Sequence, residues 1–197
     1  MSSRMPQEAR RKLALRLAQR LPKRLARRFV RDQNGASAVE FALVALPFLA
    51  LLFAILETAL VFFAGQTLET AVADASRLIL TGQAQTANYS QQDFKKAVCD
   101  RIYGLFDCNG VYVDVKQYSS FSAVNNMSPV NNGNFDTTKM TYVPGGPGCI
   151  EVVKLYYRWP VYVSLLGNSL SNLNGNYRLL VATSVFRNEP YATSGGC

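Results

Sequence analysis

One glutamate stands out among the residues of this chain that could do chemistry. Glu40 lies near the start of a long apolar stretch, and no other charged residue follows it before Glu57. A carboxylate inside a hydrophobic segment is costly unless it reaches water or a cation. We therefore expect Glu40 either to lie at the headgroup level of a membrane or to pair with a positively charged partner.

Four cysteines are the second group with clear chemistry, and all of them follow the apolar stretch: Cys99, Cys108, Cys149 and Cys197. An even number of cysteines confined to one side of such a stretch fits disulfides formed in an oxidising compartment. A zinc site is the alternative, but the chain has no histidine and no Cys-x-x-Cys spacing. More than one pairing is possible. The closeness of the first two cysteines, on either side of a predicted helix end, favours Cys99–Cys108 together with Cys149–Cys197.

The rest of the composition argues against catalysis and against nucleic-acid binding. Without histidine, the usual triads and histidine-containing metal sites are absent, and the carboxylates are scattered. We expect no enzyme activity, cofactor or metal. The net charge of +8 comes from residues 1–31, which hold eleven of the 21 Lys and Arg, so it does not indicate a nucleic-acid partner.

The apolar stretch that contains Glu40 has the length of a membrane-spanning helix. The sixteen residues from Phe41 to Leu56 carry no charge. The whole stretch from Ala36 to Ala64 would rise ~43 Å as a helix, against a hydrocarbon core of ~30 Å. Because the basic residues precede it, the N-terminus is predicted in the cytoplasm and the remainder outside. An amphipathic pattern continues the helix to a stop at Gly82.

The remaining sequence predicts a small α+β domain. A second, short helix is expected over Gln91–Tyr103, with Ser90 as its cap. Alternating apolar residues predict antiparallel strands at about Val111–Lys116, Ile150–Trp159 and Arg178–Arg187, with a long loop over 119–148. The expected divisions are a leader (1–35), a transmembrane helix (36–64), its extracytoplasmic continuation (65–82), an α+β domain (83–192) and a tail (193–197).

Particular motifs give the chain a family resemblance. Gly35, followed by four small or apolar residues and then Glu40-Phe41, resembles the cleavage site of prepilins of the Flp type. The ending Asn188-Glu189-Pro190-Tyr191 and several downstream segments are similar to the TadE-like family of minor pilins, or pseudopilins, of the tight-adherence pilus system. The resemblance covers about residues 33–192. It implies a pilin-like fold and cleavage between Gly35 and Ala36 by a prepilin peptidase.

The resemblance also implies a function and a location. The protein would be a single-pass protein of the bacterial inner membrane, with its C-terminal domain in the periplasm, and could enter a surface pilus. It would support assembly of a Flp-type pilus for adhesion and biofilm formation, with Glu40 and Phe41 used in recognition or assembly. Its partners would be the prepilin peptidase, other pilus subunits, platform proteins and the lipid bilayer. The alternatives are an uncleaved, signal-anchored periplasmic binding domain and, less favoured, a secreted or tethered enzyme.

Overall fold

The computed structural model describes residues 35–102, 104–125, 127–162, 170–192 and 197. The predicted leader apart from Gly35, residues 1–34, and most of the predicted tail, residues 193–196, lie outside the described residues. Chain contacts divide the protein into two units, Met1–Leu52 and Phe53–Cys197. The two units are therefore described separately, although one helix, α2 (Ala36–Leu80), begins in the first and continues into the second.

Helix α2 changes character along its length. Every large apolar side chain from Val39 to Leu56 is exposed, as expected of a helix surrounded by lipid. From Val61 onward one face is buried, at the three- and four-residue spacing of an amphipathic helix. The buried positions on this face are Val61, Ala64, Leu68, Ala71, Val72, Ala75 and Ile79.

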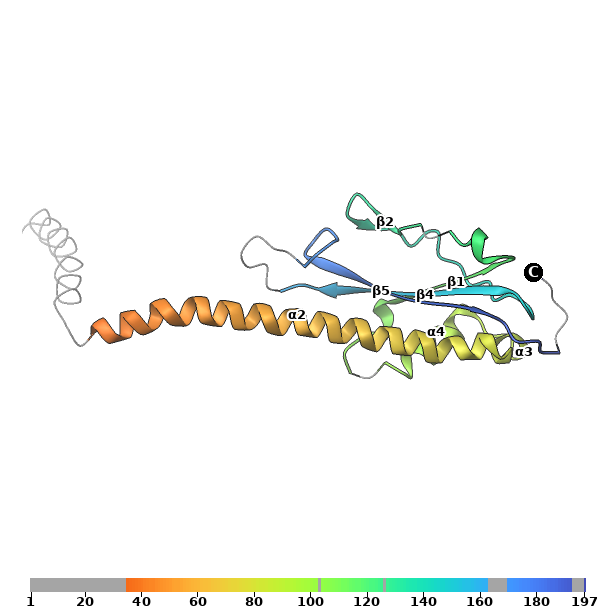
Figure 1. Cartoon of the computed structure of the whole chain (residues 1–197), viewed down its shortest axis with the longest axis horizontal. Coiled ribbons are helices and arrows are strands. Elements are labelled where there is room, and N and C mark those ends of the chain that lie inside the picture. The colour runs from red at the N-terminus through yellow and green to blue at the C-terminus, as the bar shows by residue number, and fades with distance from the viewer. Residues whose placement is uncertain (1–34, 103, 126, 163–169, 193–196) are drawn as a thin grey trace, which may run out of the picture. The chain divides into compact units, whose positions relative to one another are not determined.

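A three-stranded antiparallel sheet packs on this buried face of α2 (Figure 1). Its order is β1 (Val111–Tyr118), β4 (Ile150–Pro160) and β5 (Tyr177–Arg187), so β4 is central. Side chains alternate between the two faces of each strand. One set, including Val113, Val153 and Leu155, joins the α2 stripe in the main core, while Tyr112 and Tyr156 lie in contacts with Phe135 on the other face.

Shorter elements complete the second unit. Helix α4 (Gln91–Cys99) begins at a capping box in which Ser90 and Asp93 bond each other's backbone N–H, and it buries Phe94 and Val98. Helix α3 (Gln83–Thr86) follows the end of α2. A hairpin of β2 (Val130–Asn131) and β3 (Asn134–Phe135) lies within residues 119–148.

The predicted fold class, α+β with a long N-terminal helix and a small antiparallel sheet, is confirmed. Helix α2 ends at Leu80, two residues before Gly82, whose φ of 75° is the left-handed conformation that stops a helix. Two details differ from the expectation. Helix α4 ends at Cys99 rather than at residue 103, and the predicted loop over 119–148 contains the β2–β3 hairpin.

Candidate membrane-anchoring and processing site

The described part of the chain begins at the predicted cleavage site, the peptide bond between Gly35 and Ala36. Gly35 precedes α2, and Ala36 is the first residue of that helix. A Cβ atom added at Gly35 would meet nothing within 4 Å, and the φ of Gly35 is not in the left-handed range. Within the described chain, neither packing nor backbone conformation requires glycine at this position.

Glu40 and Phe41 follow in the first turns of α2, and both are exposed, Phe41 to 75%. No described residue hydrogen-bonds or pairs with the carboxylate of Glu40. The first unit therefore presents an unneutralised carboxylate among apolar side chains. A carboxylate in such surroundings is stabilised when it pairs with a cation, either from the lipid headgroups or from another molecule.

Helix α2 is long and apolar enough to cross a membrane. Its most apolar eighteen-residue window has a mean hydropathy of 2.6, and none of that window is buried within the protein. This is compatible with a single-pass membrane anchor close to the N-terminus.

The second charged residue of the apolar stretch, Glu57, has a different environment from Glu40. Its side chain is buried on the face of α2 that meets the sheet, and its Oε1 atom accepts the backbone N–H of Tyr162. In the sequence, Glu57 falls within the predicted transmembrane helix (36–64). Sequence periodicity alone does not indicate that a chain segment 105 residues later would bond it.

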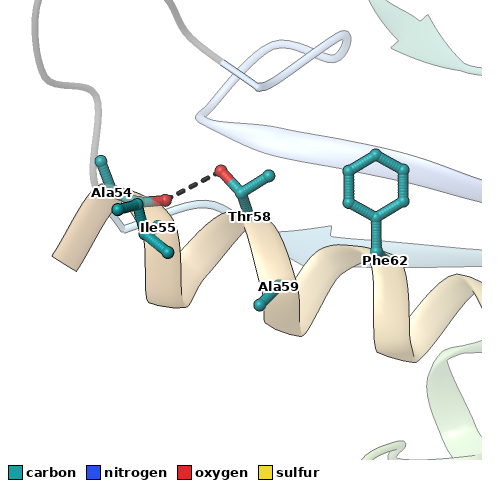
Figure 2. A pocket seen from close by; sticks show the side chains of 5 residues that line it. All are labelled: Ala54, Ile55, Thr58, Ala59 and Phe62. Atoms are coloured by element: carbon teal, nitrogen blue, oxygen red, sulfur yellow. Dashed lines mark hydrogen bonds between the residues drawn. The ribbon is translucent and has the colours of Figure 1, made fainter. Parts of the chain in front are cut away.

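A shallow groove lies on α2 beside this level. It is lined by Ala54, Ile55, Thr58, Ala59 and Phe62 (Figure 2). Its single polar side chain, Thr58, donates to the carbonyl of Ala54 at 2.8 Å. The lining thus presents hydrocarbon and no unpaired polar side chain, which suits lipid or another helix better than a polar substrate.

The four cysteines form two disulfides in the second unit. Cys99 is joined to Cys108, with the two Cα atoms 5.7 Å apart, and Cys149 to Cys197, with 5.4 Å between Cα atoms. This is the pairing favoured from the sequence. The first disulfide ties the end of α4 to the residues before β1, and the second ties the start of β4 to the last residue of the chain. No cluster of metal-ligating side chains occurs among the described residues.

Residues Asn188–Tyr191, which we call the C-terminal clamp, bind the glycine-rich turn before β4. The buried amide of Asn188 donates to the carbonyl oxygens of Gly145 and Gly146, both at 3.0 Å. The hydroxyl of Tyr191 donates to the carbonyl of Gly145 at 3.0 Å. The clamp therefore gives the Asn-Glu-Pro-Tyr ending a structural role that the sequence did not reveal.

The C-terminal clamp also holds the end of α2. The backbone N–H of Glu189 donates to the carbonyl of Leu80 at 3.0 Å, which satisfies one of the helix's terminal acceptors. The ring of Tyr191 covers Gly82 so closely that a Cβ there would lie 2.5 Å from its Cγ atom. The last turn of α2 is fixed to the sheet by these contacts.

A buried acid, Glu151, lies beneath the clamp. Its side chain is fully buried, and its Oε1 atom accepts the backbone N–H of Gly145 at 2.6 Å and a side-chain amide N–H of Asn188 at 3.3 Å. Burial raises the pKa of Glu151 to about 7, although these two hydrogen bonds act to lower it. The Oε2 atom has no described partner. We interpret Glu151 as a structural carboxyl that is neutral below about pH 7.

The sequence pointed to the cysteines, Gly35 and Glu40 as candidates, but not to the contacts of Glu57, Glu151 and the clamp. The structure places the cysteines in the second unit and Gly35 and Glu40 in the first. One signal was available for Glu151, since it is an acid inside a strand of apolar residues.

Comparison with known proteins supplies one match. The family model of TadE-like proteins matches residues 35–77, which begin at Gly35 and cover most of α2. No curated protein and no solved structure matches the chain. The similarity to TadE-like proteins thus lies in the segment that carries Gly35, Glu40 and the apolar helix.

Proposed function

We propose that this protein is the precursor of a minor pilin-like subunit that spans the bacterial inner membrane once and takes part in assembling a Flp-type pilus. A prepilin peptidase would cut it after Gly35 and leave α2 as the N-terminus of the mature subunit. Its role would be structural, without catalysis, in pili used for adhesion and biofilm formation. The observation that carries this proposal is the TadE-like match, which starts at Gly35, one residue before α2.

The local structure around Gly35 supports processing at that position. Because neither packing nor φ requires a glycine there, its presence needs another reason. A peptidase that must approach the backbone closely would supply that reason, since a glycine leaves the peptide bond unshielded. The cut would also place a new α-amino group on Ala36, four residues from Glu40.

The exposed Glu40 supports assembly through charge pairing. Its carboxylate has no described partner, and its neighbours are apolar. We propose that it pairs with the α-amino group of Ala36 from a neighbouring subunit. At 4 Å such a pair is worth about 1 kcal/mol in water and considerably more where water is excluded, so it would set both affinity and axial register.

The test is maturation of a Gly35→Leu variant in cells that contain a prepilin peptidase. We expect only the full-length precursor on a gel, whereas the wild type should shorten by the 35 residues of the leader. Gly65→Ala is the matched control, because a Cβ at Gly65 on the same helix also meets nothing within 4 Å. The control should mature normally.

Two results would contradict the proposal. If Gly35→Leu matures to the wild-type size, the cut does not depend on Gly35. If the wild type itself remains full length with an active peptidase present, the chain is an uncleaved anchor, which is the alternative reading of the sequence.

A further inference from the structure

The end of the sheet is held beside α2 at the level of Glu57. Glu57 lies four residues before Val61 and seven before Ala64, on the stripe of α2 that packs against the sheet. Its side chain is 7% exposed, and its carboxylate accepts the backbone N–H of Tyr162. Because Tyr162 follows the end of β4 by only two residues, this bond fixes the base of the domain at one height on the helix.

The surface around this level is apolar. Tyr162 is 84% exposed, and on α2 the side chains of Leu60, Phe62 and Phe63 are exposed by 50%, 70% and 60%. We call these four residues the apolar belt. A domain surrounded by water would leave several large apolar groups solvated here, at a cost of about 25 cal/mol for each Å² exposed.

The belt surrounds α2 instead of following one stripe. At about 100° per residue, positions 60, 62 and 63 point in three different directions, none of them the direction of Val61 toward the sheet. Packing on one neighbour in water gives a helix one apolar stripe with polar residues beside it, whereas a helix that is apolar on all its exposed sides is typical of a membrane span. The exposed faces instead turn polar together from Gln66, which is followed by exposed Glu69. A change at one height on all exposed sides is what a planar lipid boundary produces.

The length of the exposed apolar surface of α2 gives the depth at which the base of the domain lies in the bilayer. On the sides of α2 that face away from the sheet, no charged residue lies between Glu40 and Glu69. Gln66 is the first exposed polar residue after the apolar side chains of Leu60, Phe62 and Phe63. Residues 41–65 rise about 37 Å, more than the ~30 Å hydrocarbon core but less than the ~40–45 Å of the whole bilayer. If Gln66 lies at the outer edge of the headgroups, Glu57 and Tyr162 lie about 13 Å deeper along the helix, below a headgroup layer of roughly 5–8 Å and in the outermost part of the hydrocarbon.

The base of the domain also has the side chains of a headgroup-facing surface. Where β4 ends and β5 begins, the segments 158–162 and 177–178 contain two arginines and no acid. The guanidinium of Arg158 lies 4.6 Å from the ring centre of Tyr177, and Arg178 donates to the carbonyl of Leu170 at 2.9 Å. Tyrosine rings are enriched at membrane–water interfaces, and arginine side chains there extend their charged groups toward the lipid phosphates.

We propose that this base, formed by residues 158–162 and 177–178, is inserted into the bilayer that α2 crosses, through the headgroup layer and as far as the top of the hydrocarbon. The apolar belt faces lipid, and the bond between Glu57 and Tyr162 sets the depth. The domain then has little freedom to tilt away from the membrane, so its far end, with the C-terminal clamp, points outward. This inference rests on the proposed membrane span but does not depend on cleavage or pilus assembly.

The test uses the full chain in vesicles of phosphatidylcholine and phosphatidylglycerol, with and without lipids brominated either near the top or near the end of their acyl chains. The single tryptophan is first removed as Trp159→Phe. Tryptophan is then introduced singly as Tyr162→Trp at the base, as Phe53→Trp on the exposed apolar part of α2, or as Tyr118→Trp. Tyr118 pairs with Ile150, at the end of the sheet away from Pro160, and serves as the control.

We expect brominated lipid to reduce the emission of Tyr162→Trp and Phe53→Trp by about half or more and to leave Tyr118→Trp nearly unchanged. Quenching of Phe53→Trp alone would overturn the inference while leaving the membrane span intact. The inference would also fall if Tyr162→Trp were unquenched but blue-shifted at high protein-to-lipid ratio, because another protein copy would then cover the base. If neither Phe53→Trp nor Tyr162→Trp is quenched, the membrane span and the proposed function fail together.

Discussion

Substitution of the buried acid Glu151 by glutamine should change how the stability of the folded domain depends on pH. Burial raises the pKa of this carboxyl from 4.5 to about 7 in the folded state. The folded protein therefore keeps a proton at pH values where the unfolded chain has lost it. Stability from this group is fully present below about pH 4.5 and is lost as pH rises toward 7.

The size of the effect follows from the shift. About 2.5 pKa units at 1.36 kcal/mol each correspond to roughly 3 kcal/mol, lost at up to about 1.4 kcal/mol per pH unit. Glutamine keeps the acceptor for the N–H of Gly145 and cannot ionise. Its NH₂ group takes the place of Oε2. The side-chain oxygen of Asn188, which has no described partner, could accept a hydrogen bond from this NH₂ group. We expect Glu151→Gln to match the wild type near pH 5 and to exceed it near pH 8 by up to about 3 kcal/mol.

The assay is urea unfolding of the full chain in mild detergent, followed by near-ultraviolet circular dichroism between pH 5 and pH 8. Glu189→Gln is the matched control, because Glu189 is exposed and contributes a backbone bond to the C-terminal clamp that the substitution leaves in place. The control should keep the wild-type pH dependence. If Glu151→Gln keeps it as well, or is less stable than the wild type at every pH, the reasoning is wrong.

Three further predictions concern charge pairing, helix termination and the disulfides. Glu40→Gln should leave membrane insertion and cleavage unchanged but reduce incorporation into pili, measured by counting pili and assaying sheared fractions. Gly82→Ala should cost several kcal/mol in urea unfolding, because a Cβ there would lie 2.5 Å from a tyrosine ring; Gly104→Ala, also at positive φ but with open space, should cost only about 1 kcal/mol. Cys108→Ser should destabilise by about 2.5 kcal/mol and Cys197→Ser by about 4 kcal/mol, since the second disulfide closes the longer loop.

Each of these has a contradicting result. Loss of cleavage in Glu40→Gln would mean that the peptidase reads this glutamate, and unchanged piliation would leave it as a headgroup-level residue. Equal costs at Gly82 and Gly104 would remove the role assigned to the ring of Tyr191. Non-reduced peptide mapping that finds free thiols in protein taken from the periplasm would contradict the disulfides.

The long-range architecture was predictable where the sequence is strongly periodic. The run from Phe41 to Leu56 and the stripe that includes Leu68 and Ile79 predicted α2 within a residue or two of its observed end at Leu80. The alternation along Ile150–Trp159 predicted β4. In both cases many residues report the same period, so tertiary contacts reinforce the local pattern instead of overriding it.

Shorter elements were missed because they carry too few residues to show a period. Helix α3 has four residues, and β2 and β3 have two each. The turn between β2 and β3 did have a local signal, since Asn132-Gly133 has the positive φ angles, 49° and 74°, that this dipeptide favours in tight hairpins.

The polar contacts of the candidate site were beyond the sequence for a different reason. Whether Glu57 faces lipid or the sheet depends on which side of α2 the strands approach, and its partner Tyr162 is 105 residues away. The clamp residue Asn188 likewise meets Gly145 across 43 positions. Single-sequence patterns describe neighbours along the chain and do not encode such distant pairings.

The most direct test of the central claim is N-terminal sequencing of the protein recovered from membranes of cells with and without an active prepilin peptidase. We predict that the mature chain begins Ala36-Ser37-Ala38-Val39 when the peptidase is present, and that only the precursor is found when it is absent. A chain that keeps its leader in the presence of the peptidase, or that begins at another residue, would contradict the proposed processing and with it the assignment of α2 as the N-terminus of a pilin-like subunit.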